Sequence, residues 1–174
     1  MFKTALLVLI SWILCGPATA QDIEREGNDA IREGDRFLRQ FKAADALASY
    51  KEGIRIGQET HNDYMYAMAL VGAGQAIWYS GNLTGAADTV ELALQLFRKA
   101  NNIQIMAWTL RILSNIYDNK GDYENAFRTV REALDIYTNS VHDNQNKTLS
   151  LVQMGQLYKS IGDYEVASEY YAKA

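Results

Sequence analysis

Cysteine and proline are nearly absent from this sequence of 174 residues. Each occurs once, as Cys15 and Pro17, and both lie within the first twenty residues. Without that segment the chain can form no disulfide and has no thiolate nucleophile or soft metal ligand, so its stability must come from packing. The lack of proline beyond residue 17 favours long, uninterrupted helices.

The first twenty residues have the composition of a secretory signal peptide. Lys3 precedes an almost wholly apolar run over residues 5–15, and Ala18-Thr19-Ala20 then leads into a polar sequence. The apolar run is too short for a membrane span, which needs about 20 residues. A lipid anchor on Cys15 is disfavoured, because Leu14 stands where lipoprotein signals have a small residue. We predict a signal peptide at 1–20 and an exported protein, periplasmic or secreted.

Basic residues are fewer than acidic ones and are not clustered. Residues 21–174 contain 16 Lys and Arg against 21 Asp and Glu. A modestly acidic chain without basic patches is a poor match for nucleic acid or an anionic membrane surface. We therefore expect no nucleic-acid partner.

The rest of the chain repeats itself about every 40 residues. Small and large side chains return in register, with successive spacings of 40, 40 and 41 residues. Three such columns are Ala46, Ala86, Ala126, Ala167; Gly34, Gly74, Ser114, Gly155; and Phe37, Ile77, Tyr117, Tyr158. A period in this range indicates stacked supersecondary units, in which small residues allow neighbouring helices to approach closely.

Each repeat is predicted to be a helix, a tight turn and a second helix. Three of the turns contain glycine followed by a capping residue, at Gly81-Asn82, Gly121-Asp122 and Gly162-Asp163, whereas the first has Gln40-Phe41. Glycine can end a helix in the left-handed conformation, and Asn or Asp can cap the next helix. Apolar residues recur at helical spacing without sustained alternation, so we expect no strands. The predicted first helices are 23–39, 62–80, 102–119 and 143–160, and the second helices are 43–59, 83–99, 123–139 and 164–174.

The best repeats resemble the tetratricopeptide repeat family. The pattern is carried by Leu110, Leu113, Ser114, Tyr117, Gly121, Tyr123, Ala126, Val130, Ala133, and again by Leu151, Met154, Gly155, Tyr158, Gly162, Tyr164, Ala167, Tyr171, Ala174. A period of 40–41 instead of 34, and the missing proline after the second helix, are similar to the long-repeat branch found in kinesin light chains and bacterial signalling proteins.

This resemblance implies an all-α, right-handed α-solenoid with a concave groove lined by the first helices. The four repeats would cover 23–61, 62–101, 102–142 and 143–174, the last one truncated. Carrying over the family's groove positions gives a mixed surface of rings, amides and charges. The predicted peptide-binding residues are Met68, Val71, Gln75, Trp78, Tyr79, Trp108, Arg111, Asn115, Asp118, Asn119, Gln156 and Lys159, to which the first repeat adds Asn28, Ile31, Asp35, Leu38 and Arg39 and the fourth adds Leu149, Val152 and Ser160.

In this groove, amides would pair with a peptide backbone and rings would cover apolar side chains. The alternative, in which Trp78, Tyr79 and Trp108 only fill the core between repeats, fits the pattern equally well.

No catalytic constellation is visible, and we expect neither enzymatic activity nor a cofactor. The only histidines, His61 and His142, fall in separate predicted turns, where His61-Asn62-Asp63 and His142-Asp143-Asn144 could hold a metal. Solvated capping turns explain these tripeptides better.

The predicted function is a non-catalytic protein- or peptide-binding module, either a scaffold or the input domain of a longer sensor. The last repeat stops in mid-pattern at Ala174, so its open face is expected to meet a second copy or a downstream domain. The alternatives are a self-associating structural array and, less favoured, a metal-dependent accessory enzyme using the histidine turns.

Overall fold

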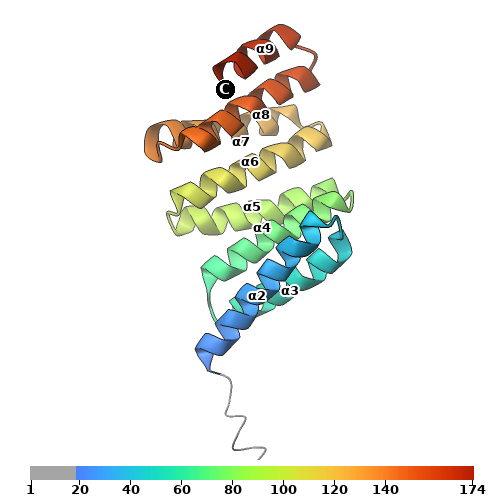
Figure 1. Cartoon of the computed structure of the whole chain (residues 1–174), viewed down its shortest axis with the longest axis vertical. Helices are drawn as coiled ribbons and strands as arrows, with labels where there is room; N and C mark the ends of the chain where they lie inside the picture. Colours follow the sequence, from blue (N-terminus) through green and yellow to red (C-terminus); the bar gives the residue numbers. More distant parts are fainter. Residues whose placement is uncertain (1–18) are drawn as a thin grey trace, which may run out of the picture.

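A computed structural model describes residues 19–174, which form an elongated stack of helices (Figure 1). The predicted signal peptide falls almost entirely on residues 1–18, outside the described part. From residue 19 onward there are eight α-helices and no strand. The elements are α2 (Ala20–Arg39), α3 (Ala43–Glu59), α4 (Asp63–Tyr79), α5 (Leu83–Lys99), α6 (Ile103–Lys120), α7 (Tyr123–Asp135), the π-helix η1 (Ile136–Ser140), α8 (Asn144–Ser160) and α9 (Tyr164–Lys173).

Consecutive helices pack against one another as hairpins, and the hairpins stack along the long axis (Figure 1). The first helices of neighbouring hairpins, α2, α4, α6 and α8, also contact one another in sequence. The predicted all-α solenoid is therefore confirmed. None of the helices beyond residue 18 is both long and apolar enough to cross a bilayer.

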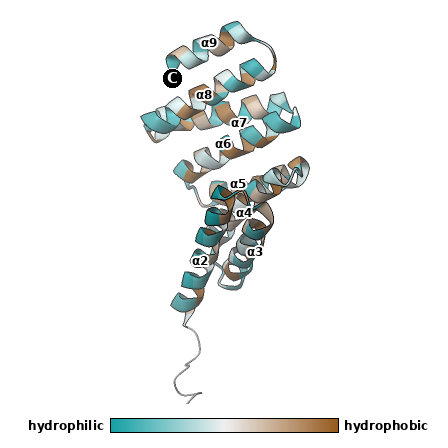
Figure 2. Ribbon diagram, turned by 45° about the vertical axis from the view of Figure 1, so that its right-hand side comes forward, coloured by the Kyte–Doolittle hydropathy of each residue, from teal (hydrophilic) through white to brown (hydrophobic). Residues whose placement is uncertain are grey.

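The helix that begins the described stack is more polar than those inside it. Figure 2 shows α2 largely in hydrophilic colours. Ion pairs one turn apart run along it, joining Asp22 to Arg25, Asp29 to Arg32 and Glu33 to Arg36. By contrast α4 lies between α3 and α5 and buries nine residues. Because α2 is covered by other helices on one side only, its opposite face meets solvent and is accordingly polar.

The short turns inside the hairpins use the left-handed conformation. Gly81, Gly121 and Gly162 have φ values of 90°, 77° and 86°, and Phe41 occupies the equivalent place with φ 58°. The next residue caps the following helix in the last three hairpins, because its side chain accepts a backbone N–H two or three residues into that helix. The predicted turn chemistry is confirmed there, and Phe41 shows that the first turn has the same shape without glycine.

The last turn between hairpins contains one additional residue. Phe97 is followed four residues later by the left-handed Asn101, whereas Tyr137 is followed five residues later by the left-handed His142. The π-helix η1 lies in this interval and accommodates the extra residue, since each π-turn is one residue longer than an α-turn. The predicted uninterrupted helix 123–139 was therefore wrong in its last turn. The 41-residue spacing has its physical origin here.

The small-residue columns lie where hairpins are tightest. Ala46, Ala86 and Ala126 are completely buried, and Ala167 is 3% exposed. A methyl group on Gly34 would lie 2.7 Å from the Tyr50 ring. These observations confirm that small side chains allow the paired helices to approach.

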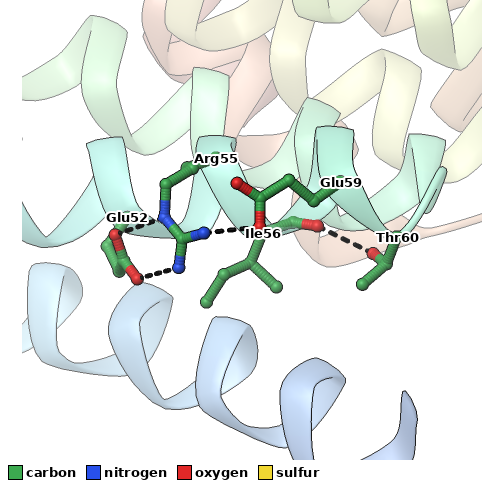
Figure 3. Close-up of polar contacts among 5 residues, drawn as sticks. All are labelled: Glu52, Arg55, Ile56, Glu59 and Thr60. Atoms are coloured by element: carbon green, nitrogen blue, oxygen red, sulfur yellow. Dashed lines mark hydrogen bonds and ion pairs between the residues drawn. The ribbon is translucent and has the colours of Figure 1, made fainter.

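The outer surface of α3 is solvated and ion-paired. Arg55 lies between Glu52 and Glu59 and donates hydrogen bonds to both carboxylates, while the Thr60 hydroxyl donates to the Ile56 carbonyl at 2.8 Å (Figure 3). The hydrogen bond with Glu52, followed by that with Glu59, raises the pKa of the Arg55 guanidinium. Such exposed pairs contribute little to stability, so this face provides solubility.

Candidate functional site

The face formed by α2, α4, α6 and α8, here called the first-helix face, carries three hollows. The first hollow, of about 480 Å³, is lined by Ile31, Asp35, Leu38, Arg39, Phe41, Met68, Gly72, Gln75, Tyr79 and Trp108. The second, of about 590 Å³, is lined by Trp78, Asn115, Asp118, Asn119, Gln156, Lys159, Ser160 and Tyr171. The third, of about 430 Å³, is lined by Met68, Gln104, Ile105, Trp108, Tyr137 and Asn146.

Ten of the twelve predicted site residues line these hollows. Met68, Gln75, Tyr79 and Trp108 line the first hollow, and Trp78, Asn115, Asp118, Asn119, Gln156 and Lys159 line the second. Met68 and Trp108 also border the third hollow, so the first and third are neighbours. The side chains come from α4, α6 and α8, which places one extended surface across three hairpins.

Val71 does not belong to this surface. Its side chain is fully buried in a cluster with Ala67, Leu70, Ala93 and Phe97. It lies on α4 between Met68 and Gln75, yet it belongs to the core and is not exposed to a ligand. The prediction that Val71 contacts a ligand is corrected on this ground.

Arg111 is committed to the contact between α6 and α8. Its guanidinium donates to the Asn146 side-chain oxygen at 3.0 Å. The Gln153 amide, 4% exposed, donates to the Arg111 carbonyl at 2.9 Å and to the Asn115 side-chain oxygen at 2.8 Å. Arg111 Nε and Gln153 Oε1 are buried without a hydrogen-bond partner among residues 19–174. Arg111 thus holds two helices together, and it lines none of the three hollows.

The two tryptophans belong both to the core and to the surface. Trp78 packs against the central core cluster and lines the second hollow, while Trp108 packs against a neighbouring cluster and lines the first and third. Tyr79 is 52% exposed and stacks on Trp78, with ring centroids 5.3 Å apart. The two interpretations of these rings, core filling and ligand contact, are therefore compatible.

The sequence pattern missed Phe41. This side chain is 81% exposed, lines the first hollow and meets the Tyr79 ring edge to face, with centroids 6.3 Å apart and planes at 88°. The family's groove positions lie on helices, so a residue in a turn was not considered. The available signal was a phenylalanine where the other three hairpins have glycine.

Two tyrosine–carboxylate pairs lie beside this face. The Tyr50 hydroxyl donates to Asp35 at 2.6 Å, and the Tyr117 hydroxyl donates to Glu91. Burial, followed by the hydrogen bond to its carboxylate, raises the pKa of each tyrosine. Arg39 and Lys159, which line hollows, form no ion pair with another described residue. Each cation shares its hollow with one carboxylate, Asp35 in the first and Asp118 in the second.

The histidine turns have a conformational explanation. His61 and His142 take the left-handed conformation, with φ of 54° at each, and the ring Nδ1 of His142 lies 2.9 Å from the Thr138 carbonyl oxygen. Within residues 19–174 no three His, Cys, Asp or Glu side chains gather into a group that could hold a metal. The geometry of the described residues gives the metal alternative no support.

Comparison with known proteins agrees with the helical pattern. The family model described as "Tetratricopeptide repeat" matches residues 105–174. No curated protein matches the chain in sequence.

Similar solved structures include the TPR-like repeats of a kinesin light chain from Podosopora anserina, with 13% identity, a TM-score of 0.73, and coverage of 85% of this chain and 72% of that one. BtubC (BKLC) from P. vanneervenii has 18% identity and a TM-score of 0.74, with coverage of 84% and 61%. The apo form of RapI has 16% identity and a TM-score of 0.74, and this chain covers 42% of its length. At such identities the likeness establishes the fold.

Proposed function

We propose that this protein, whose residues 105–174 belong to the tetratricopeptide repeat family, is a non-catalytic module that binds a protein or peptide on its first-helix face. The supporting observation is a row of side-chain amides at equivalent positions of successive repeats. Gln75, Asn115 and Gln156 are 40 and 41 residues apart and line the first and second hollows. Primary amides match the donors and acceptors of a peptide backbone, so the row suits an extended segment.

The row is partly pre-oriented. Asn115 accepts from Gln153 through its side-chain oxygen, which fixes the amide plane and leaves its NH₂ group for a partner. Half-buried rings next to the amides supply apolar contact, and Trp108 separates the first hollow from the third. Groups that are already ordered lose less conformational entropy when a ligand binds.

Selection from a random peptide library tests this proposal. Peptides captured by the full-length protein should bind the double variant Gln75→Ala/Gln156→Ala about tenfold more weakly or worse, because each amide loses its hydrogen bonds to the peptide. The matched control is Gln58→Ala/Gln95→Ala, which removes two exposed amides from α3 and α5. Equal weakening by both double variants, or by neither, would place binding elsewhere.

We also propose that the protein is exported, on the composition of residues 1–20. Cleavage after Ala20 would remove Thr19, whose hydroxyl accepts the Asp22 backbone N–H and caps α2. The mass of the protein recovered from its native host tests export, since a chain beginning at Gln21 is expected. A role as scaffold or as the input domain of a sensor follows from the family resemblance alone.

One observation favours self-association as a second candidate. Ile161, Tyr164 and Tyr171, near the last hairpin, are 46%, 70% and 41% exposed. Exposed apolar groups of this size can form an interface with another copy or another domain. Light scattering of the wild type and of Tyr164→Ser distinguishes the cases, because a concentration-dependent dimer lost in the variant would support self-association.

A further inference from the structure

Phe41 is doubly unfavourable for folding. It has φ 58°, a region in which the Cβ of an L-residue is crowded, and glycine occupies the equivalent position in the other three hairpins. Its side chain is 81% exposed and so gains little from burial. Strained residues that add little to the core are concentrated at functional sites, which makes Phe41 a candidate ligand contact.

Phe41 extends a series of ring contacts that starts at the first hollow and reaches Trp78, which lines the second. Its ring stands perpendicular to that of Tyr79, and Tyr79 stacks on Trp78 with an interplanar angle of 20°. Met68, on α4, adds an apolar side chain to the lining of the same hollow. The first hollow is therefore bordered by exposed aromatic rings, which have few rotatable bonds to order when a ligand binds.

The polar groups around this hollow include several hydrogen-bond donors that have no partner among residues 19–174. The Asp35 carboxylate already accepts the Tyr50 hydroxyl at 2.6 Å. Arg39, Gln75 and Tyr79 line the same hollow and take no part in the side-chain hydrogen bonds and ion pairs of residues 19–174. Arg39 offers only donors, and Tyr79 and Gln75 each add N–H or O–H groups. A suitable ligand therefore presents carbonyl oxygens to these donors.

Proline-rich peptide has this chemistry. Proline has no backbone N–H, and in the polyproline II conformation the carbonyls are free because the helix has no internal hydrogen bonds. Its pyrrolidine rings pack well against aromatic side chains, and its stiffness lowers the entropic cost of binding.

We propose that the first hollow binds a proline-rich segment in the polyproline II conformation, with Phe41 and Tyr79 against the pyrrolidine rings and with Arg39 and Gln75 donating to the carbonyls. This inference rests on the proposed peptide-binding function, to which it adds the class of ligand.

Calorimetric titration with an acetylated and amidated peptide of ten prolines tests the proposal. The full-length protein should bind this peptide, and Phe41→Gly should weaken binding at least fivefold while the Tm stays the same or rises, because glycine relieves the backbone strain. Tyr79→Ala should weaken binding similarly. The matched control is Tyr123→Ala, which removes an exposed ring that lines none of the three hollows and should leave the affinity unchanged.

The possible results separate this inference from the function on which it rests. A lower Tm with unchanged affinity in Phe41→Gly would show that Phe41 is structural, and equal binding of a ten-residue glycine–serine peptide would show that proline is not selected. Either result overturns the inference. If decaproline fails to bind but library peptides still depend on Gln75 and Gln156, only the proline-rich ligand is refuted. If no library peptide depends on those amides, the proposed function fails as well.

Discussion

The interface between the first two hairpins and the interface between the last two are held together by different kinds of contact, although within the last hairpin a ring, Tyr171, again packs against a glycine, Gly155. At the first interface, the Tyr50 ring lies between Gly34 of α2 and Gly72 of α4, where a methyl group on either glycine would collide with it. At the last interface, Val130 and Ser114 replace Tyr50 and Gly34 in register, and Gln153 replaces Gly72. Ser114 donates to the Ala126 carbonyl at 2.9 Å. One large ring packs against glycines in the first case, and smaller groups with hydrogen bonds fill the space in the second.

The difference shows that side chains of different size and polarity can fill equivalent positions of this solenoid. The middle interface has a third solution, because Val90 and Ile112 stand at the positions of Tyr50 and Gly72. In a closely packed interface, a substitution that changes the combined volume of two facing side chains is destabilising. An exchange that keeps their combined volume is tolerated better.

Gly72→Ile should have the largest effect on stability. Its side chain would enter the space of the Tyr50 ring, and we expect a loss of about 3 kcal/mol in the free energy of unfolding. Adding Tyr50→Val converts the site to the Val90 and Ile112 combination of the next repeat and should recover most of that loss. Urea unfolding of the two single variants and the double variant measures the coupling. Additive losses would show that volume is not exchanged between these positions.

Gln153→Ala tests the hydrogen-bonded interface between α6 and α8 and should lower the free energy of unfolding by less than Gly72→Ile does. It removes hydrogen bonds to the Arg111 carbonyl and to Asn115, and we expect a loss of about 2 kcal/mol. The same unfolding measurement applies. Gln156→Ala, an exposed amide on the same helix, is the matched control and should change little. If both variants lose the same stability, the Gln153 network does not hold α6 to α8.

Much of this fold could be predicted from periodicity, because small residues at a fixed spacing specify where helices approach. Apart from the last turn of the helix predicted at 123–139, the predicted helices agree with the observed ones, and Ala46, Ala86 and Ala126 are buried as expected. The π-helix could not be placed, although the 41-residue spacing revealed an extra residue. An inserted residue can be absorbed in a turn or in a helix, and local sequence does not decide between them.

The candidate site was less predictable, since it depends on helix rotation and on side-chain partners. Val71 and Met68 are three residues apart on one helix, yet one is buried and the other lines a hollow. Whether Arg111 faces a ligand or Asn146 depends on the neighbouring helix, which spacing within α6 does not reveal. Phe41 lies in a turn, where helical periodicity carries no information.

Tyr50→Phe should have the smallest effect at neutral pH and a distinctive dependence on pH. The variant loses the hydrogen bond that the Tyr50 hydroxyl donates to Asp35, which should lower the free energy of unfolding by about 1 kcal/mol at pH 7. Burial and the hydrogen bond to Asp35 raise the pKa of Tyr50 in the folded protein. Its contribution to folding stability is therefore fully present below the pKa of a tyrosine in the unfolded chain, about 10, and is lost as the pH rises above that value. Above that pH the wild type should lose about 1.4 kcal/mol of folding stability per pH unit because of this tyrosine, and the variant should not.

Urea unfolding at pH 8 and at pH 11 measures the difference in stability between the wild type and Tyr50→Phe. This difference should shrink to zero or change sign between the two pH values. The control Tyr164→Phe changes a ring that is 70% exposed and should match the wild type at both. A difference that stays constant with pH would mean that the interface between the first two hairpins does not depend on a neutral, buried Tyr50.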